Sequence, residues 1–328
     1  MTLAAPSADD GPGDEVETRE APVTAAEHGL RLDKALALRV PEFSRTWLQA
    51  LVERGHVRLD GTEFRLSSRR LRVGQRLAVD LVPTAESLAF HAQPMAIRAL
   101  WEDEHLLVLD KPAGLVVHPA AGHWSGTLLN GLLARHPDAA RLPRAGIVHR
   151  LDKDTSGVMV VGKTLEAVTA LSRAIAERVV QRRYLALAHG ELAEGAFSVE
   201  APIGRDPVSR LRMAVVASGK PARTDVRRVA VRDGFSAVHC ALHTGRTHQI
   251  RVHLAHRGHP LVADAVYGGK PALGLSRQAL HAWHLLLPHP VTGVPVAVCC
   301  APPPDFETGW LAVTGAKALE SPLDGCDV

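Results

Sequence analysis

Two stretches near the start of the chain carry hydrophobic residues at helical spacing. The first is marked by Leu32, Ala35, Leu36 and Val40, and it ends at Pro41 because proline cannot continue a helix. The second follows Ser44, a good N-cap, ends at Gly55, and presents an apolar face of Trp47, Leu48, Leu51 and Val52. Residues 57–61 then read as a strand that enters an Asp-Gly turn. Two short helices and a hairpin predict a small domain at residues 28–82.

Beyond residue 97 the pattern changes to short apolar runs bounded by glycine, proline or charge. These runs predict strands at residues 106–109, 115–117, 146–148, 158–161, 184–188, 235–242 and 294–299. Helical spacing of apolar residues predicts helices over 164–179 and 248–257. Many strands with few helices between them predict an α+β fold. We expect a mixed, mainly antiparallel sheet with flanking helices at residues 97–315.

The remaining segments show no apolar periodicity. Residues 1–27 are rich in alanine, proline, aspartate, glycine and glutamate, which predicts a disordered acidic tail. Residues 83–96 run from Pro83 through Pro94 and predict a linker between the two domains. Residues 316–328 are assigned to a C-terminal tail.

The formal net charge of +3 hides an uneven distribution. Residues 1–30 hold seven acidic residues and one basic residue, whereas residues 31–76 hold eleven basic and five acidic residues, a net +6. A compact segment with this charge is typical of a phosphate-binding surface. A solvated basic face would give the same composition.

Cysteine usage and the absence of long apolar runs indicate the compartment. The four cysteines form no C-x-x-C pair, which argues against a zinc knuckle and a disulfide framework. No apolar run approaches the roughly 20 residues that span a bilayer, and the acidic N-terminus lacks the order of a signal peptide. We therefore expect a soluble, cytoplasmic protein.

The most informative stretch is HRLDKDTSG, residues 149–157. It forms a polar loop between two predicted strands, a position typical of catalytic residues. Asp152 lies among His149, Arg150 and Lys153, and nearby cations favour an ionised carboxylate. Such a carboxylate suits a nucleophile or a base. From these residues alone, the alternative interpretation is a structural Asp–Arg pair that caps a turn.

The segment HRLDKDTSG resembles the signature of the RluA-type pseudouridine synthases, whose catalytic aspartate is that of HRLD. Three further segments resemble family motifs in the same order: KPAGLVVHP (111–119), RRYLAL (182–187) and GRTHQIRVH (245–253). The resemblance spans residues 97–303, and it departs at Ala263, where the family often has glycine. The helix–helix–hairpin pattern of residues 28–82 resembles the S4-type RNA-binding domain.

The resemblance implies an isomerase that converts uridine to pseudouridine in structured RNA without a cofactor or a metal. It implies Asp152 as the catalytic carboxylate, Arg246 as its ion-pair partner and Tyr184 as the residue that stacks on the uracil, with its hydroxyl within reach for proton transfer. Ile250 would back the pocket. Candidate RNA contacts are Arg150, Lys153, Arg182, Arg183, Arg251 and, in the S4-like domain, Arg69, Arg70 and Arg72.

The combination of an S4-like domain with this core implies a stem-loop of large-subunit (23S) ribosomal RNA, or a pre-ribosomal particle, as substrate. Transfer RNA and a catalytically silent RNA-binding or ribosome-assembly role are the alternatives. A metal enzyme is a third alternative, suggested by His243, His248, His253, His256 and His259, but no H-E-x-x-H spacing supports it. No sequence feature demands a membrane or more than a monomer.

Overall fold

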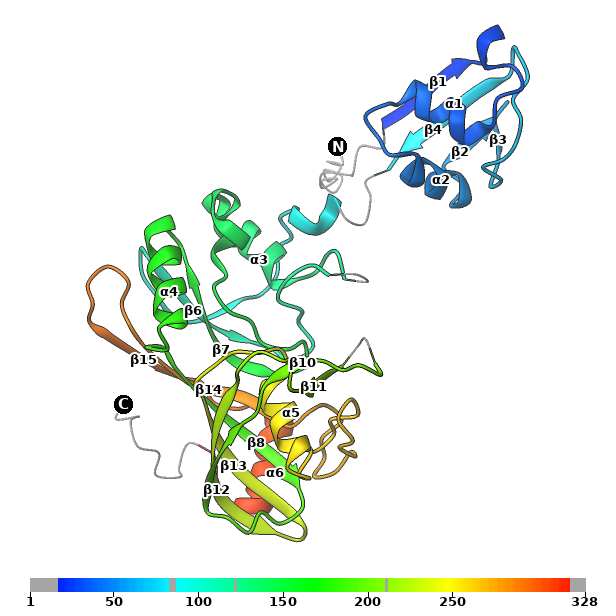
Figure 1. Ribbon diagram of the computed structural model, residues 1–328. Helices are drawn as coiled ribbons and strands as arrows, with labels where there is room; N and C mark the ends of the chain where they lie inside the picture. The colour runs from blue at the N-terminus through cyan, green and yellow to red at the C-terminus, as the bar shows by residue number, and fades with distance from the viewer. Residues whose placement is uncertain (1–16, 83–86, 121–122, 210–211, 319–328) are drawn as a thin grey trace, which may run out of the picture. The chain divides into compact units, whose positions relative to one another are not determined.

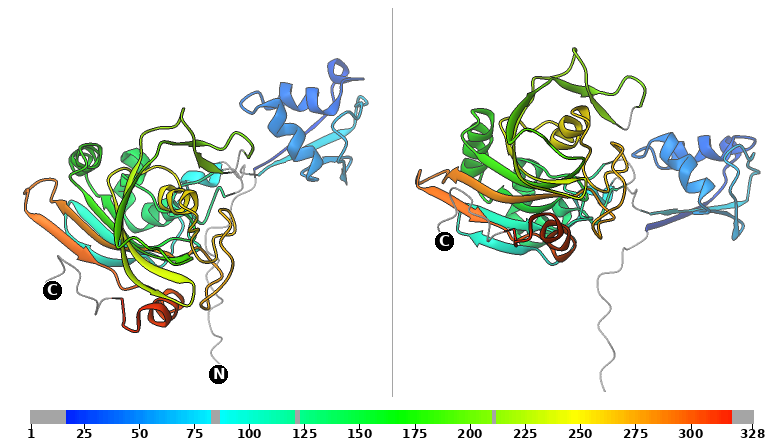
Figure 2. Two further views of the ribbon diagram at one scale, coloured as in Figure 1. Left: turned by 60° about the horizontal axis from the view of Figure 1, so that its bottom comes forward. Right: turned by 90° about the horizontal axis from the view of Figure 1, so that it is seen from below.

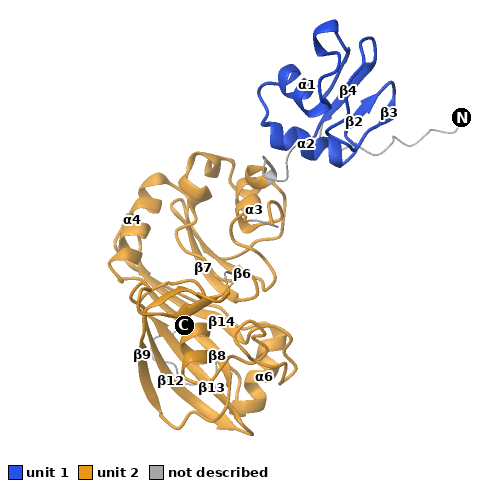
Figure 3. Ribbon diagram, turned by 45° about the vertical axis from the view of Figure 1, so that its right-hand side comes forward, with its two compact units in different colours: residues 1–88 blue, residues 89–328 orange. Residues whose placement is uncertain are grey.

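The computed structural model describes residues 17–82, 87–120, 123–209 and 212–318 (Figure 1). The chain divides into two compact units, Met1–Leu88 and Ala89–Val328 (Figure 3). Each unit has a hydrophobic core of its own. Within the described ranges, no helix has the length and apolar character needed to cross a membrane.

The smaller unit is a four-stranded antiparallel sheet with two helices. Its strands lie in the order β1-β4-β2-β3. The elements are β1 (Glu17–Pro22), η1 (Ala25–Glu27), α1 (Leu32–Arg39), α2 (Arg45–Glu53), β2 (Val57–Leu59), β3 (Thr62–Glu63) and β4 (Arg76–Leu81). Both predicted helices are confirmed, and Ser44 caps α2 by accepting a hydrogen bond from the Trp47 amide.

The expected disordered tail is wrong for residues 17–27, which belong to the smaller unit. Strand β1 pairs along its whole length with β4, from Glu17 opposite Leu81 to Pro22 opposite Arg76. Glu27 accepts two hydrogen bonds of 2.7 Å from Arg39, at Nε and Nη2. Strand β1 lies at the edge of the sheet, is mostly exposed, and pairs with β4 partly through the Glu20–Arg76 ion pair. Its sequence therefore lacks the alternation of apolar and polar residues from which strands are predicted. Residues 1–16 of the expected tail lie outside the described residues.

The larger unit is built on a nine-stranded mixed sheet in the order β5-β6-β7-β14-β8-β13-β12-β9, with β15 also paired to β14. Among the described strands of this sheet, the β7–β14 pair is parallel and the others are antiparallel. The sheet strands are β5 (Arg98–Glu102), β6 (Leu106–Lys111), β7 (Ser156–Gly162), β8 (Gln181–His189), β9 (Ala196–Glu200), β12 (Arg223–Arg232), β13 (Phe235–Leu242), β14 (Leu280–Pro288) and β15 (Pro295–Cys299).

Helices cover both faces of this sheet (Figures 1 and 2). Alternate residues of β8 point to opposite faces: Tyr184 and Ala186 join one core cluster, and Leu185 and Leu187 join another. The first cluster takes side chains from α3, α4 and α5, and the second from α6. The remaining elements are η2 (Ser87–Phe90), α3 (Leu128–Arg135), η3 (Pro137–Arg141), η4 (Pro143–Gly146), α4 (Leu165–Ala176), β10 (Ile203–Arg205), β11 (Met213–Val215), α5 (Gln249–His256) and α6 (Pro304–Thr314).

Two predicted strands are absent from the described structure. Residues 115–117 form no strand, because the Val116 and Val117 carbonyls accept hydrogen bonds from the first amides of α3. Of residues 146–148, Gly146 ends the turn η4, in which Arg144 and Ala145 both have φ of 53°, and the segment pairs only through a single bridge from Ile147 to Val161. Short apolar runs predict burial, and here burial occurs without a sheet ladder.

The expected linker at residues 83–96 is wrong for residues 89–96, which belong to the larger unit. The Asn130 side chain in α3 donates hydrogen bonds to the carbonyls of Ala89 and His91, and the Asn130 carbonyl accepts one from Gln93. Residues 83–86 lie outside the described residues. At the other end, Ala318 is buried and its amide donates to Glu307, so the expected C-terminal tail is wrong at that residue.

Two of the cysteines lie in the core of the larger unit. Cys240 and Cys300 are buried free thiols.

A buried carboxylate organises the smaller unit. Asp33, in the first turn of α1, is fully buried and accepts hydrogen bonds from Arg31, Arg45 and Gln49. Burial acts to raise the pKa of Asp33, but the hydrogen bonds outweigh it and hold that pKa well below its usual range. The ionised carboxylate therefore joins the N-terminal ends of α1 and α2.

We predict that Asp33→Asn loosens α1 and α2. Losing charge-assisted hydrogen bonds to a buried group removes about 1.5–3 kcal/mol, so amide exchange there at pH 7 rises by roughly 10- to 100-fold. Because the folded pKa is depressed, the wild-type stabilisation is present above pH about 4 and lost as pH falls below it. Hydrogen-exchange mass spectrometry of the full chain measures this. Glu53→Gln, at an exposed position of α2, is the matched control, and equal exchange in both variants would contradict the prediction.

Candidate active site

The HRLDKDTSG segment forms the loop that leads into β7 and carries Asp152. Lys111, at the end of β6, is fully buried beneath it. The Lys111 ammonium donates hydrogen bonds of 2.7–2.9 Å to the carbonyls of Pro112, Leu115 and Lys153. Burial lowers the pKa of Lys111 to about 8, although Asp154 and Asp152 act to raise it. The role of Lys111 in holding the loop was not predicted from the sequence, where Lys111 appeared only as the first residue of the motif KPAGLVVHP.

A glycine lets this loop reach the centre of the sheet. Gly157 pairs with Ala282 where β7 meets β14, and its φ is +115°. A Cβ atom at this position would lie 2.0 Å from the Ala282 carbonyl oxygen. Only glycine combines that backbone conformation with so close an approach. The last residues of the signature are therefore required by the strand pairing.

Arg251 connects Asp152 to a second carboxylate. Its Nη1 donates to Asp152 Oδ2 at 3.0 Å, while Nε and Nη2 donate to the two Asp264 oxygens at 2.7 and 2.8 Å. The side chains of Arg251, Asp264 and Asp152 are 5%, 1% and 16% exposed. The Tyr267 ring also packs on the guanidinium, whose carbon lies 5.0 Å from the ring centroid. This arrangement fixes the orientation of the Asp152 carboxylate.

The expected pairing of Asp152 with Arg246 is therefore wrong. Arg246 Nε donates instead to the Pro221 carbonyl at 3.2 Å. Asp152 and Arg246 nevertheless line one common cavity. The motif GRTHQIRVH offers two arginines, and only the second lies within α5 on its buried side. Arg251, expected to contact RNA, is instead the ion-pair partner of Asp152.

Tyr184 projects from β8 into the cavity, where Ile250 and Leu280 supply apolar walls. Tyr184 is 5% exposed, and burial raises the pKa of its phenol to about 12. Val158, near the start of β7, is buried in the core cluster that also includes Tyr184 and Ile250. The structure thus brings Asp152, Tyr184 and Ile250 together as the sequence predicted.

His248 also lines this cavity, directly before α5. Its Nδ1 lies 2.8 Å from the Tyr267 hydroxyl, and its Nε2 lies 3.9 Å from Asp152 Oδ1. The Tyr267 oxygen also accepts the Met213 amide at 3.1 Å. The sequence singled out His248 only as part of a histidine-rich tract, so its place beside Asp152 was not predicted.

The candidate RNA contacts separate into groups. Arg150 and Arg182 line the cavity, as Arg246 does, whereas Lys153 and Arg183 are not among its lining residues. Arg69, Arg70 and Arg72 are exposed in the smaller unit. The cavity is lined by His149, Arg150, Leu151, Asp152, Thr155, Arg182, Tyr184, Leu242, Gly245, Arg246, Thr247, His248, Gln249, Ile250 and Leu280.

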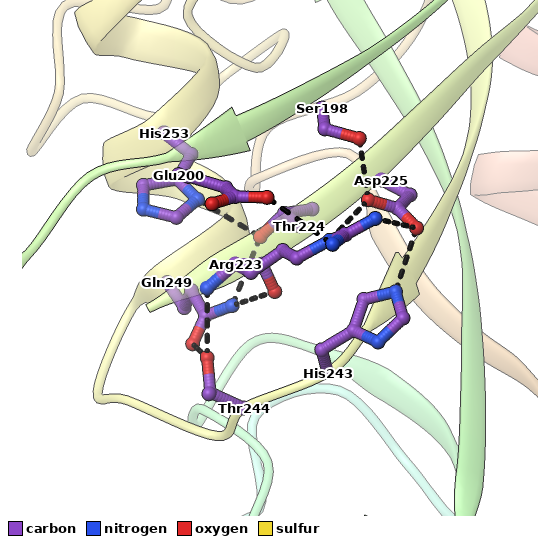
Figure 4. A network of polar contacts seen from close by, with 9 residues as sticks. All are labelled: Ser198, Glu200, Arg223, Thr224, Asp225, His243, Thr244, Gln249 and His253. Carbon is purple, nitrogen blue, oxygen red and sulfur yellow. Dashed lines mark hydrogen bonds and ion pairs between the residues drawn. The ribbon is translucent and has the colours of Figure 1, made fainter. Parts of the chain in front are cut away.

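A polar network holds α5 in place (Figure 4). The Gln249 amide group donates at 2.9 Å to the Arg223 carbonyl and the Thr224 hydroxyl, both in β12. The Gln249 side-chain oxygen accepts from the Thr244 hydroxyl at 2.7 Å and from the Arg246 amide. Because Arg251 lies two residues further along the same helix, this network also positions the Asp152 ion pair.

The histidine tract has separate partners. His243 contacts Asp225 at 2.6 Å, and His253 contacts the Thr224 hydroxyl (Figure 4). His253 also contacts the Ala201 carbonyl. His259 contacts the His189 carbonyl. In the part of the chain that the structure describes, no three His, Cys, Asp or Glu side chains are placed to hold a metal ion together.

Comparison with known proteins gives consistent matches. Residues 105–256 match the family model described as RNA pseudouridylate synthase. The chain is 48% identical over 273 residues to the ribosomal large subunit pseudouridine synthase D of Nitrosomonas europaea, covering 81% of this chain and 79% of that protein. It is 46% identical over 304 residues to the protein of the same name in Xanthomonas campestris, covering 88% and 90%.

A solved structure shows the same fold. The human RNA pseudouridylate synthase domain containing 1 superposes with a TM-score of 0.52 at 28% sequence identity. The match covers 66% of this chain and 90% of that one.

We predict that Asp264→Asn strongly destabilises the larger unit. Removing one charge from a buried ion pair costs about 3–5 kcal/mol, because the partner charge stays buried. Glu194→Gln is the matched control, since Glu194 pairs with Arg257 at the surface with side chains 53% and 43% exposed. A pair of that kind contributes less than about 1 kcal/mol. Chemical denaturation of the full chain measures both variants, and equal losses would show that Arg251 does not depend on Asp264.

Proposed function

Because the chain belongs to the RluA-type family of RNA pseudouridine synthases and is such an isomerase, we propose that it acts on uridines of large-subunit ribosomal RNA. The relatives that share 40–48% of their residues with it carry the name ribosomal large subunit pseudouridine synthase D. The observation that carries the proposal is the Asp152 carboxylate, oriented by Arg251 in a cavity that also holds Tyr184.

The reaction breaks the bond from uracil N1 to ribose C1′, turns the base over and joins C5 to C1′. It involves no redox change and no net group transfer, so the site needs no electron carrier. It needs a carboxylate beside the sugar or the base, a platform for the uracil and exclusion of water. Asp152 supplies the carboxylate, whether it attacks C1′, adds to C6 or removes the C2′ proton. Tyr184 supplies the platform, and Ile250 closes the apolar side.

The target uridine must leave its stack to enter this cavity, at a cost of a few kcal/mol. Arg150, Arg182 and Arg246 lie at the cavity and are placed to hold the backbone of the flipped nucleotide. Lys153 lies next to Asp152 in the same loop, whereas Arg183 lies on the opposite face of β8 from Tyr184 and lines a different pocket. Proteins that recognise RNA sequence favour unstacked loops, so we propose a stem-loop substrate.

The smaller unit is proposed to be an S4-like domain that grips RNA phosphates. Its helices and hairpin follow the expected order, and Arg69, Arg70 and Arg72 are exposed on it. Arg70 Nη1 donates to the Gly29 carbonyl at 2.8 Å, and the Arg69 guanidinium lies over Phe64. These contacts hold two of the three cations in defined positions on the surface. Phosphate contacts of this kind fix the register of the protein on RNA without reading bases.

We predict that Asp152→Asn lowers pseudouridine formation at least about 10⁴-fold while RNA affinity stays near normal. The amide keeps the shape of the carboxylate but cannot act as a nucleophile or a base. Release of tritium from C5-labelled large-subunit ribosomal RNA measures the activity. Asp154→Asn, two residues along the same loop and not among the cavity-lining residues, is the matched control and is expected to keep full activity. Substantial turnover by Asp152→Asn would reject this carboxylate.

We further predict that replacing Arg69, Arg70 and Arg72 together with glutamine flattens the salt dependence of RNA binding. Each phosphate contact contributes a slope of roughly −0.7 to −0.9 in log affinity against log salt, so about two units are lost if most of the three reach phosphates. Single-turnover isomerisation at saturating RNA stays near wild type. Affinity measured across a salt series tests the prediction. An unaltered slope in a folded triple variant would mean that this surface does not bind RNA.

A further inference from the structure

His248 has a backbone conformation that few side chains adopt. It precedes α5 with φ of 58° and ψ of 22°, the left-handed region. For a residue other than glycine this conformation costs about 1–2 kcal/mol. Such strain persists only where the surrounding structure enforces it, and it is common at active sites. Here the enforcement comes from the Gln249 network on one side and the Tyr267 contact on the other.

The contacts of the ring distinguish its two nitrogens. Nδ1 lies 2.8 Å from the Tyr267 hydroxyl, and the two rings meet edge to face at 81°. Nε2 lies 3.9 Å from Asp152 Oδ1, which is beyond hydrogen-bond length. The imidazole is therefore fixed through Nδ1, and Nε2 is the nitrogen directed toward the catalytic carboxylate in the cavity.

Every route to pseudouridine requires a group that accepts the proton from C5. Once C5 has joined C1′, that carbon carries both the new bond and its original hydrogen. We propose that His248 Nε2 is the general base that removes this proton. The assignment rests on the proposed function, and it gives His248 the proton transfer that the sequence assigned to Tyr184.

The step balances without an external reagent. The Nε2 lone pair takes the proton, and the electrons of the C5–H bond restore the C5=C6 double bond of the uracil. The imidazolium that forms has its Nδ1–H toward the Tyr267 oxygen and its Nε2–H toward Asp152. It returns the proton to water as the product leaves. Uracil N1, which left the sugar with the bonding electrons, takes up one proton, so the net change moves a proton from C5 to N1.

The electrostatics of the cavity favour His248 over Tyr184 for this step. Burial raises the pKa of Tyr184 to about 12, so the phenol keeps its own proton at neutral pH. Burial lowers the pKa of His248, and Arg251 and Arg150 lower it further, while Asp152 and Asp264 act to raise it. The net effect is a neutral imidazole, the form that accepts a proton. Tyr184 remains the surface on which the uracil stacks.

Variants at this position can be matched to its backbone. His248→Asn replaces the base with a polar residue that tolerates the left-handed region. His248→Gly fits the same conformation and leaves room for imidazole from solution. His256→Asn makes the same change at an exposed position of α5 and serves as the control. Thermal unfolding of each full-length variant verifies that it is folded.

The experiment is single-turnover conversion of a large-subunit ribosomal RNA transcript made with uridine that carries hydrogen or deuterium at C5. His248→Asn is expected to be slower by about 10²- to 10⁴-fold, the usual contribution of a general base. Its rate should show a larger C5 deuterium isotope effect than wild type, because proton removal becomes rate-limiting. Added imidazole should restore activity to His248→Gly in proportion to its concentration, while His256→Asn matches wild type.

Three results would overturn the assignment. Rates within about twofold of wild type for both His248 variants would show that no base acts there. Slow variants that lack an increased isotope effect and imidazole rescue would show that His248 only positions other groups. A wild-type enzyme that leaves the transcript unmodified would reject the proposed substrate, and with it this step.

Discussion

The active site depends on one buried cation, Arg251, shared between two carboxylates. Placing a guanidinium at 5% exposure is unfavourable unless its donors are satisfied. Asp264 takes two of them and Asp152 takes a third. Because the two acids come from segments far apart in sequence, the ion pair joins the loop of residues 149–157 to α5. The Tyr267 ring packs on the guanidinium and adds a further contact to this centre.

Each side of this centre is held by a buried polar anchor. Lys111 fixes the loop that carries Asp152 by donating to three carbonyl oxygens, one of them that of Lys153. The Gln249 side chain fixes α5 through two hydrogen bonds to β12 and two from Thr244 and Arg246 in the loop before the helix. Neither side chain needs to touch the substrate. Lys111 holds the loop in position and Gln249 holds the helix in position. The Asp152–Arg251 hydrogen bond depends on both, because it joins the loop to the helix.

Local patterns predicted much of the fold, and tertiary pairing explains the failures. Helices α1, α2 and α5 and strand β13 were predicted because periodicity and capping are properties of neighbouring residues. Strand β1 was missed because its stabilisation comes from pairing with β4, a segment that begins more than fifty residues later. Residues 115–117 have the composition of a strand, but their carbonyl groups satisfy the start of α3 instead.

The same distinction applies to the site. Asp152, Tyr184 and Ile250 were predicted from motifs, and the structure places all three at one cavity. The choice between Arg246 and Arg251 could not be made from the motif, because both residues fit it and only the path of α5 separates them. His248 was visible only as one histidine of a tract. Its role depends on a left-handed turn and on Tyr267, nineteen residues away.

Burial in the cavity shifts the pKa values of two of its titratable side chains in opposite directions. Burial disfavours whichever form of a group is charged, so it raises the pKa of the Tyr184 phenol and lowers that of the His248 imidazole. Both side chains are therefore uncharged at neutral pH: the Tyr184 phenol keeps its proton, and the His248 imidazole has one nitrogen free to accept a proton. The charge in this region is concentrated in the Asp152–Arg251–Asp264 system, where ion pairs compensate it. In the proposed reaction, a neutral uracil enters beside a neutral aromatic ring and a neutral base, while the Asp152 carboxylate lies beside the sugar. Separating the charged pair from the neutral proton acceptor lets one small cavity provide both functions.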